Sequence, residues 1–210
     1  MRREVHPIEA ESYRIMRSLV DLSHLGPLSR AVAERVIHAS ADLEYARSLL
    51  LDEAALRRGL RALRSGAPLV ADARMVAAGI TARESLCLVS DERVRDLAAR
   101  EGITRSAAGF RLAFRLVGPG AVWVVGNAPT ALFELLDLGA DPALVVGLPV
   151  GFVGAAESKA ALAASDLPSL TNVGTKGGSA VAAAAVNALL YFEGDEVPEN
   201  GFGSRDGGAV

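Results

Sequence analysis

From residue 67 onward the chain alternates short apolar runs with helical segments, and this alternation limits its fold more than any other feature. Such a pattern is typical of βαβ units, in which helices connect the strands of a parallel sheet. We therefore expect an α/β fold around a parallel five-stranded sheet. The runs that predict strands are PLVA (68–71), SLCLV (85–89), AVWVV (121–125), ALVV (143–146) and SLTNV (169–173).

The segments after and between these runs have helical periodicity. The last of them, SAVAAAAVNALLY, is apolar nearly all round. We expect it to be buried between the sheet and either another layer or a second subunit. Its one amide side chain, Asn187, would then bond to backbone or to a subunit contact. The predicted helices are 93–100, 104–117, 128–138, 155–164 and 179–191.

The first 65 residues look helical instead, as an N-terminal extension of the same domain. Pro27 opens a second helix, and a third is predicted over 52–63. We expect one domain over residues 1–192. Residues 193–210 are rich in glycine, acid and proline without a period, which predicts a disordered tail. The residues on one face of the first helix are Ile8, Ser12, Ile15 and Leu19.

Composition and the N-terminal sequence indicate the cellular compartment of the protein. Half of the residues are hydrophobic and the mean hydropathy is +0.28, yet no apolar run reaches the roughly 18 residues of a membrane span. The N-terminal residues lack the apolar core of a secretory signal. We therefore expect a cytoplasmic protein without a membrane partner. Cys87 is the only cysteine, which excludes an internal disulfide framework and a cysteine-clustered metal site.

Charge and aromatic content argue against nucleic acid as a partner. The net charge is −3, and the 22 lysines and arginines are scattered along the chain. A nucleic-acid binder would group them on one surface. Aromatic residues make up only 5% of the chain, which leaves few platforms for base stacking.

Three glycine-containing loops follow the third, fourth and fifth predicted strands. Ligands of open parallel sheets bind beyond the carboxyl ends of the strands. Glycine allows close backbone approach, and the N–H groups at a helix start attract anions. These loops therefore predict an extended anionic ligand, with ordinary tight turns as the alternative. They are GNAPT (126–130), GLPVGFVG (147–154) and GTKGGS (174–179).

A nucleotide is the obvious competing ligand. The last loop lacks the GxxxxGK[ST] arrangement of a phosphate loop, and no GxGxxG follows any predicted strand. Both findings disfavour ATP and NAD.

The segment RVIHASADLEYA (35–46) places His38 at the end of an apolar helix. Glu34 lies one turn before it and Asp42 one turn after, so either carboxylate could hold and orient a charged imidazole if the helix continues. A structural histidine is the alternative. His6 and His24, in polar flanking segments, are weaker candidates.

Three further polar residues could face the same ligand. Arg105 and Ser106 follow the candidate N-cap Thr104, so their helix would begin at the loop edge. Arginine there can bind a carboxylate through two parallel hydrogen bonds, or it can simply be solvated. The hydroxyl of Ser12 can bond back to a helix carbonyl or face the ligand.

Four motifs occur in order along the chain: ITRSAA (103–108), GNAPTALF (126–133), PVGFVGAAESK (149–159) and KGGS (176–179). Together they resemble the motifs of a known family, the precorrin-8X methylmutases, which include the cobalt-precorrin-8 enzymes. The likeness runs from residue 6 to about residue 191. It implies a flavodoxin-like, doubly wound fold and a homodimer. It further implies an isomerase that moves a methyl group from C-11 to C-12 of a tetrapyrrole in cobalamin biosynthesis, without a redox cofactor, methyl donor or protein-bound metal.

The resemblance also implies roles for individual residues. His38 matches the family's catalytic histidine. We expect it to act as a proton donor, by protonating or hydrogen-bonding a macrocycle nitrogen. A non-catalytic tetrapyrrole carrier, or a nucleotide-binding enzyme, is the alternative function. The residues implied or expected to bind substrate are Ser12, Arg35, Arg105, Ser106, Asn127, Thr130, Lys176, Gly177, Gly178 and Ser179.

The chain departs from the family pattern at three places. Ala41 stands where many members have glycine, and Thr175 replaces a frequent arginine. Ala71-Asp72-Ala73 stands in place of TDT. These changes concern the peripheral carboxylate contacts and leave His38 intact.

Overall fold

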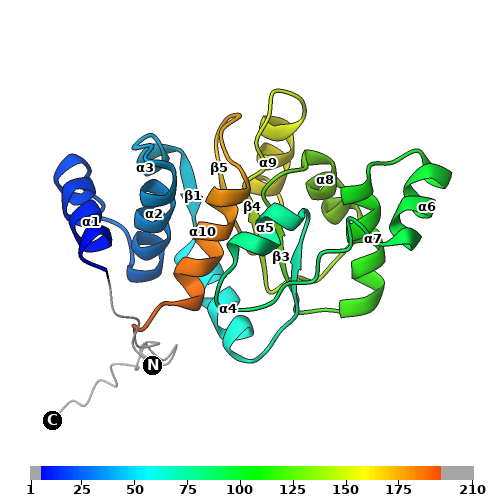
Figure 1. Cartoon of the computed structure of the whole chain (residues 1–210), viewed down its shortest axis with the longest axis horizontal. Coiled ribbons are helices and arrows are strands. Elements are labelled where there is room, and N and C mark those ends of the chain that lie inside the picture. The colour runs from blue at the N-terminus through cyan, green and yellow to red at the C-terminus, as the bar shows by residue number, and fades with distance from the viewer. Residues whose placement is uncertain (1–5, 195–210) are drawn as a thin grey trace, which may run out of the picture.

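The computed structural model describes residues 6–194. A five-stranded sheet in the order β1-β5-β4-β3-β2 forms the centre, with helices on both faces (Figure 1). This confirms the predicted α/β class. The strands are β1 (Leu49–Leu51), β2 (Leu69–Ala71), β3 (Val122–Val125), β4 (Leu144–Gly147) and β5 (Ser169–Asn172).

Helices connect the strands over the second part of the chain, and all five helices predicted there are found, with each end within one residue of the prediction. The helices are α1 (Pro7–Leu19), α2 (Pro27–Ser40), α3 (Tyr45–Ser48), α4 (Glu53–Arg64), α5 (Arg74–Gly79), α6 (Glu92–Glu101), α7 (Arg105–Val117), α8 (Pro129–Asp137), α9 (Ala155–Ala163) and α10 (Ser179–Leu190).

Strand β3 shows how the two faces of the sheet are covered. All four of its residues are buried, which is typical of a parallel strand with helices on both sides. Val122 and Val124 join the core cluster of α2, α4 and α10. Trp123 and Val125 face the other way, into the cluster of α7 and α8. Successive residues of β3 therefore pack alternately into two cores, one on each face of the sheet.

The expectation of five parallel strands is wrong for one strand. β2 to β5 are parallel, but β1 lies at the edge and pairs with β5 antiparallel. The predicted strand 85–89 makes only one bridge, Val70 with Leu86. Arg83 before it donates to the carbonyl oxygens of Leu63, Gly66 and Ala67, and Asp91 after it caps α6.

The bridge nevertheless completes the predicted topology. In chain order, the parallel elements are β2, the Leu86 segment, β3, β4 and β5. Numbered 1 to 5 in that order, they lie in the sheet as 2-1-3-4-5, which is the flavodoxin-like order. In such a sheet the crevice at the carboxyl ends opens between β2 and β3, where the direction of winding reverses.

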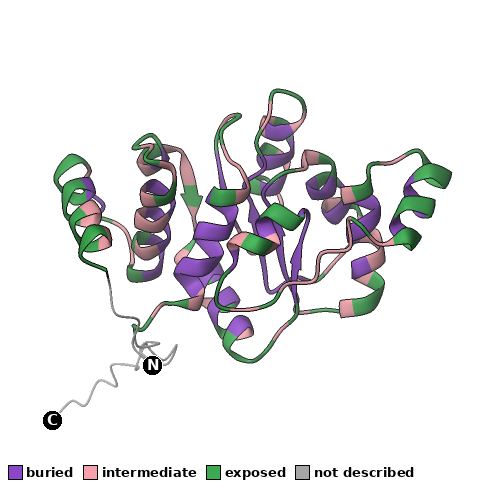
Figure 2. Ribbon diagram, in the orientation of Figure 1, coloured by how far each residue is buried: buried purple, intermediate pink, exposed green. Residues whose placement is uncertain are grey.

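Helix α10 is buried almost throughout, from Val181 to Leu189 (Figure 2). The layer that covers it consists of α2 and α5 of the same chain, which decides between the two alternatives that the sequence left open. Asn187 accepts a hydrogen bond from Thr81 N at 3.1 Å and donates to Gly79 O at 2.7 Å. Its role is structural, as expected.

Helix α1 lies at the outer end of the molecule, beside α2 (Figure 1). Three of the four residues on its predicted face are exposed: Ile8 at 75%, Ile15 at 46% and Leu19 at 63%. The helix is anchored instead by the buried Met16. An apolar stripe therefore remains uncovered in the single chain.

None of the described helices is long and apolar enough to cross a membrane. Most of the segment predicted to be a disordered tail, residues 195–210, lies outside the described residues.

Candidate functional site

Helix α2 is anchored along its inner face and at its start, and these contacts position the last turn. Leu28, Val32 and Val36 are completely buried along its inner face. At its start, the Glu53 carboxylate accepts hydrogen bonds from the N–H groups of Leu28 and Ser29. These contacts satisfy donors that a helix start otherwise leaves open.

His38 lies in the last turn of α2 and is oriented by α1. Its Nδ1 is 3.0 Å from Ser12 Oγ, and its ring stacks on Tyr13 with centroids 4.6 Å apart and planes 9° from parallel. No partner for Nε2 exists among residues 6–194. The imidazole is half-buried, so one ring nitrogen is held and the other is open.

The carboxylates expected to hold His38 have other partners. Glu34 forms a bidentate ion pair with Arg17 of α1, at 2.9 and 2.6 Å. Asp42 bonds to Lys176. The helix does not continue to Asp42, because it ends at Ser40 and Ala41 is left-handed, with φ of 53°. The expectation of a carboxylate partner is therefore wrong, and Ser12 takes that place.

The three glycine loops converge at the carboxyl edge of the sheet, as expected. Gly178 N donates to Leu148 O at 2.8 Å and Gly151 N to Thr175 O at 3.1 Å, which joins the second loop to the third. Gly126 packs so closely on Ser179 that a Cβ there would lie 3.0 Å from the serine Cα. The first loop therefore touches the third.

Gly177 is fixed by both conformation and space. Its φ is +159°, and a Cβ at this position would collide with the carbonyl oxygens of Leu148 and Pro149. Only glycine fits there.

Asp72 follows β2 at the crevice and anchors the first loop. Its buried carboxylate accepts N–H bonds from Gly126 at 3.1 Å, Asn127 at 2.9 Å and Ala128 at 2.6 Å. Burial raises the pKa of this carboxyl group, although the three N–H bonds oppose the shift. From the sequence, Asp72 was identified only as part of a departure from the family pattern. An acidic residue directly after a predicted strand could have indicated a role at this loop.

Two predicted substrate-binding residues, Ser106 and Asn127, bond to Asp72, and two more, Arg105 and Thr130, lie at the starts of α7 and α8. The helix N-termini of α7 and α8 are joined by Thr104 and Thr130, whose hydroxyl oxygens are 2.7 Å apart. Arg105, the first residue of α7, is exposed and has no partner within the described part of the chain. Ser106 Oγ donates to Asp72 O at 3.2 Å.

Lys176 connects the third loop to the end of α2. Its Nζ lies 2.7 Å from carboxylate oxygens of both Asp42 and Glu44. These bonds raise the pKa of Lys176 and lower that of Asp42. Gly177, Gly178 and Ser179, also predicted to bind substrate, continue from it into α10. The last turn of α2, which carries His38, thus lies at the same edge of the sheet as the glycine loops.

Arg35 lies on a different side of α2. It pairs with Glu9 at 3.1 Å and sits over the Tyr191 ring at 5.8 Å. It lines a cavity of about 800 Å³ between α1, α2 and the end of α10. The structure therefore separates Arg35 from the loop edge.

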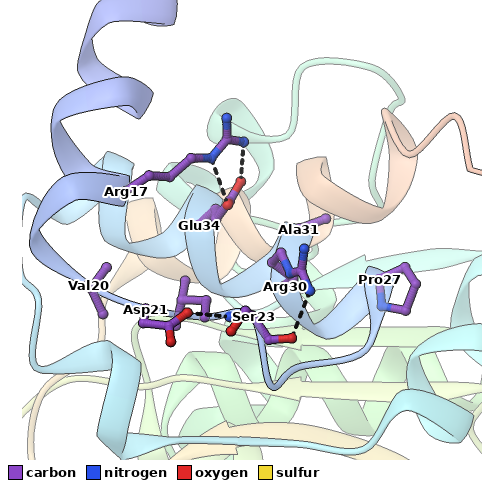
Figure 3. Close-up of a pocket in the computed structure, with 9 residues that line it drawn as sticks. Arg17, Val20, Asp21, Ser23, Pro27, Arg30, Ala31 and Glu34 are labelled. Atoms are coloured by element: carbon purple, nitrogen blue, oxygen red, sulfur yellow. Dashed lines mark hydrogen bonds and ion pairs between the residues drawn. The ribbon is translucent and has the colours of Figure 1, made fainter.

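A neighbouring cavity of about 500 Å³ lies between the end of α1 and the start of α2 (Figure 3). Arg17 and Glu34 form its upper wall, and Arg30 reaches to the Ser23 carbonyl below. His38 lines neither cavity. Arg105 lines neither of these cavities either, and α2 and α7, which carry the two residues, lie well apart in the fold (Figure 1).

Sequence reasoning also missed Lys159, the last residue of the PVGFVGAAESK motif. Its side chain is buried beneath the third loop, with 1% exposed. Nζ donates to Asn172 Oδ1 at 3.1 Å and to the Lys176 carbonyl oxygen. Burial lowers the pKa of Lys159 to about 8.

Comparison with known proteins agrees with this architecture. A family model described as precorrin-8X methylmutase matches residues 7–192. The cobalt-precorrin-8 methylmutase of Methanothermobacter thermautotrophicus is 42% identical, over 91% of this chain and 95% of that protein. The precorrin-8X methylmutase of Pseudomonas aeruginosa is 43% identical, over 89% and 95%.

A solved structure of the precorrin-8X methylmutase from Thermus thermophilus superposes with a TM-score of 0.79 at 38% identity. The match covers 87% of this chain and 93% of that one. By sequence and by fold, the chain belongs to the precorrin-8X methylmutase family, whose members are isomerases of cobalamin biosynthesis.

Proposed function

We propose that this protein moves a methyl group from C-11 to C-12 of precorrin-8X or cobalt-precorrin-8, to give hydrogenobyrinate or cobyrinate. The bond to C-11 breaks as the bond to C-12 forms within one molecule, so no methyl donor or redox partner is consumed. The observation that carries the proposal is the His38 imidazole. It is held on one side by Ser12 and Tyr13 and open on the other, beside a loop edge rich in N–H groups.

His38 acts as the proton donor to a macrocycle nitrogen in this proposal. The contacts of its Nδ1 and ring face leave Nε2 for the substrate. A proton there would favour migration toward the conjugated product. General acid assistance is typically worth ~10²- to 10⁴-fold in rate.

The substrate's acetate and propionate arms would meet the glycine loops and nearby cations. Arg105 is exposed and unpaired among the described residues, so it can bind a carboxylate without first losing a partner. Lys176 must exchange Asp42 or Glu44 for a substrate carboxylate. Ser106, Asn127, Thr130 and Ser179 would add polar contacts, whereas Arg35 lies away from this edge and is not part of the proposed contacts.

The Asp72 carboxylate disfavours the nucleotide alternative. Nucleotide phosphates in flavodoxin-like folds bind at the crevice where winding reverses. Here a carboxylate already accepts the N–H groups of the loop at that crevice. A phosphate would meet a negative charge and find these donors taken.

We propose that both the metal-free and the cobalt-containing substrate are accepted. Relatives named for each are similarly close, at 43% and 42% identity. The metal would sit in the macrocycle and need no protein ligand. Within residues 6–194, no group of three or more His, Cys, Asp or Glu side chains could hold a metal ion.

His38→Ala tests the chemical role. The variant should still bind hydrogenobyrinate, while kcat falls by ~10²- to 10⁴-fold because the proton donor is lost. Absorbance titration measures binding and stopped-flow absorbance measures turnover. His24→Ala, which changes an exposed histidine near the start of α2, is the matched control. Equal turnover by His38→Ala and the wild type would rule out the role.

We also propose that the protein is a homodimer in which a second copy covers the apolar stripe of α1. The support is the exposure of Ile8, Ile15 and Leu19 on one helix face, together with the family resemblance. Leu19→Glu should convert the dimer to a monomer in sedimentation velocity. A wild-type protein that sediments as a monomer at micromolar concentration would contradict the proposal.

A further inference from the structure

Lys159 is a buried cation without a described counter-charge. Its side chain is completely enclosed, and both partners of its Nζ are neutral oxygens, Asn172 Oδ1 and the Lys176 carbonyl. Burying an ammonium group away from a carboxylate is unfavourable, and here burial lowers the pKa to about 8. Because fold stability would be better served by an apolar side chain, the position of Nζ calls for another explanation.

The Lys176 carbonyl is held by two donors from inside the protein. Asn172 Nδ2 donates to it at 3.0 Å, and Lys159 Nζ donates as well. Peptide units are planar, and the described chain contains no cis bond. The N–H of Gly177, in the same peptide unit, must therefore point away from Lys159. It has no acceptor among the described residues.

This N–H group belongs to a larger set of open donors. Helix α10 begins two residues later, and its N-cap, Gly178, provides no side-chain bond. The N–H groups of Ser179, Ala180 and Val181 have no backbone acceptor in the described part of the chain. Donors of this kind at a helix start favour an anion.

We propose that Lys159 is a positioning residue that, with Asn172, aims the Gly177 N–H at a carboxylate arm of the tetrapyrrole. The inference rests on the proposed function and adds to it a residue that never touches the substrate. The ammonium group also polarises the carbonyl that it binds, which makes the N–H of the same peptide unit a stronger donor. The backbone of Leu148 and Pro149 packs closely against Gly177, which limits where this peptide unit can lie.

Lys159→Met keeps a long side chain and removes the donor. A hydrogen bond to a charged group contributes enough that the variant should bind hydrogenobyrinate about tenfold more weakly. The KM for precorrin-8X should rise by a similar factor while kcat changes little, because the lost contact serves ground state and transition state alike.

Leu162→Ala is the matched control, since Leu162 is completely buried on the same helix, α9. It should lower the melting temperature at least as much as Lys159→Met and leave product affinity unchanged. Asn172→Leu removes the other donor to the same carbonyl. Its effect should combine less than additively with that of Lys159→Met.

Two results would overturn the inference. One is wild-type affinity and KM in Lys159→Met, and the other is an equal loss of affinity in Leu162→Ala. Amide hydrogen exchange of ligand-free protein separates this inference from the proposed function. If the wild type fails to bind any tetrapyrrole, the proposed function fails. A Gly177 amide that exchanges equally in wild type and Lys159→Met then also excludes control of this peptide by Lys159, and a changed exchange rate supports it.

Discussion

The two ends of the candidate site are built in different ways. At the histidine end, side chains of two helices meet, and the orientation of His38 depends on Ser12 and Tyr13 of α1. At the loop end, backbone N–H groups carry the binding, and buried polar side chains lock them in place. Asp72 holds the first loop, and Lys159 holds the third.

This difference separates two requirements of the proposed reaction. Multiple carboxylates need many donors in fixed places, which locked backbone supplies. Proton transfer needs one side chain with a set orientation. The loop end is anchored within the single chain, whereas α1 leaves apolar residues such as Leu19 exposed. The loop end should therefore be the more robust of the two in an isolated subunit.

The largest expected effect on stability is at the loop end. Asp72→Ala would leave three N–H groups of the first loop without their acceptor, which should reduce the free energy of unfolding by about 3 kcal/mol. Urea denaturation measures the change. Asp72→Asn retains one acceptor oxygen and should lose less. A loss below about 1 kcal/mol in Asp72→Ala would show that Asp72 does not lock this loop.

The next effect is at the histidine end. Ser12→Ala should lower kcat about tenfold, because the imidazole loses its hydrogen bond at Nδ1, with little change in product affinity. Ser18→Ala is the control, since the Ser18 hydroxyl donates only to Ile15 O within α1. Steady-state kinetics measure kcat for both variants. An unchanged kcat in Ser12→Ala would mean that Tyr13 stacking alone orients the ring.

Ala41→Gly probes the turn that follows His38. Ala41 is the one non-glycine residue with positive φ among those described, and the left-handed conformation disfavours a Cβ. The change should raise the free energy of unfolding by about 1 kcal/mol. Ala39→Gly, inside α2, should lower it by a similar amount. Thermal denaturation of both variants gives the comparison, and destabilisation by Ala41→Gly would contradict the account.

The smallest effect is the pH dependence contributed by Lys159. Its folded-state pKa of about 8 lies below the ordinary value of 10.5. As the pH rises past 8, the folded protein therefore loses this proton while the unfolded chain still holds it. The stability of the wild type relative to Lys159→Met should therefore increase with pH. Between pH 7 and 8.5 the gain should be under about 1 kcal/mol. A difference that stays flat over this range would exclude a buried, titrating Lys159.

The loop end could largely be predicted from sequence, because carboxyl ends of parallel strands share one edge and glycine loops mark them. The histidine end could not. The partner of His38 lies 26 positions away and depends on how α1 packs on α2. The role of Lys159 could not be predicted either, because the burial of a single helix residue beneath a loop depends on the assembled fold. Strand β1 was missed because LLL lies between helical segments and pairs only with the free edge of β5.

A single-turnover absorbance measurement tests the central claim most directly. Precorrin-8X is mixed with a small excess of wild-type protein, and the pigment is then extracted and identified. Our account requires conversion to hydrogenobyrinate, with the methyl group on C-12 in the extracted pigment. Recovery of unchanged precorrin-8X after a spectral shift on binding would instead show a tetrapyrrole carrier and contradict the proposed isomerase.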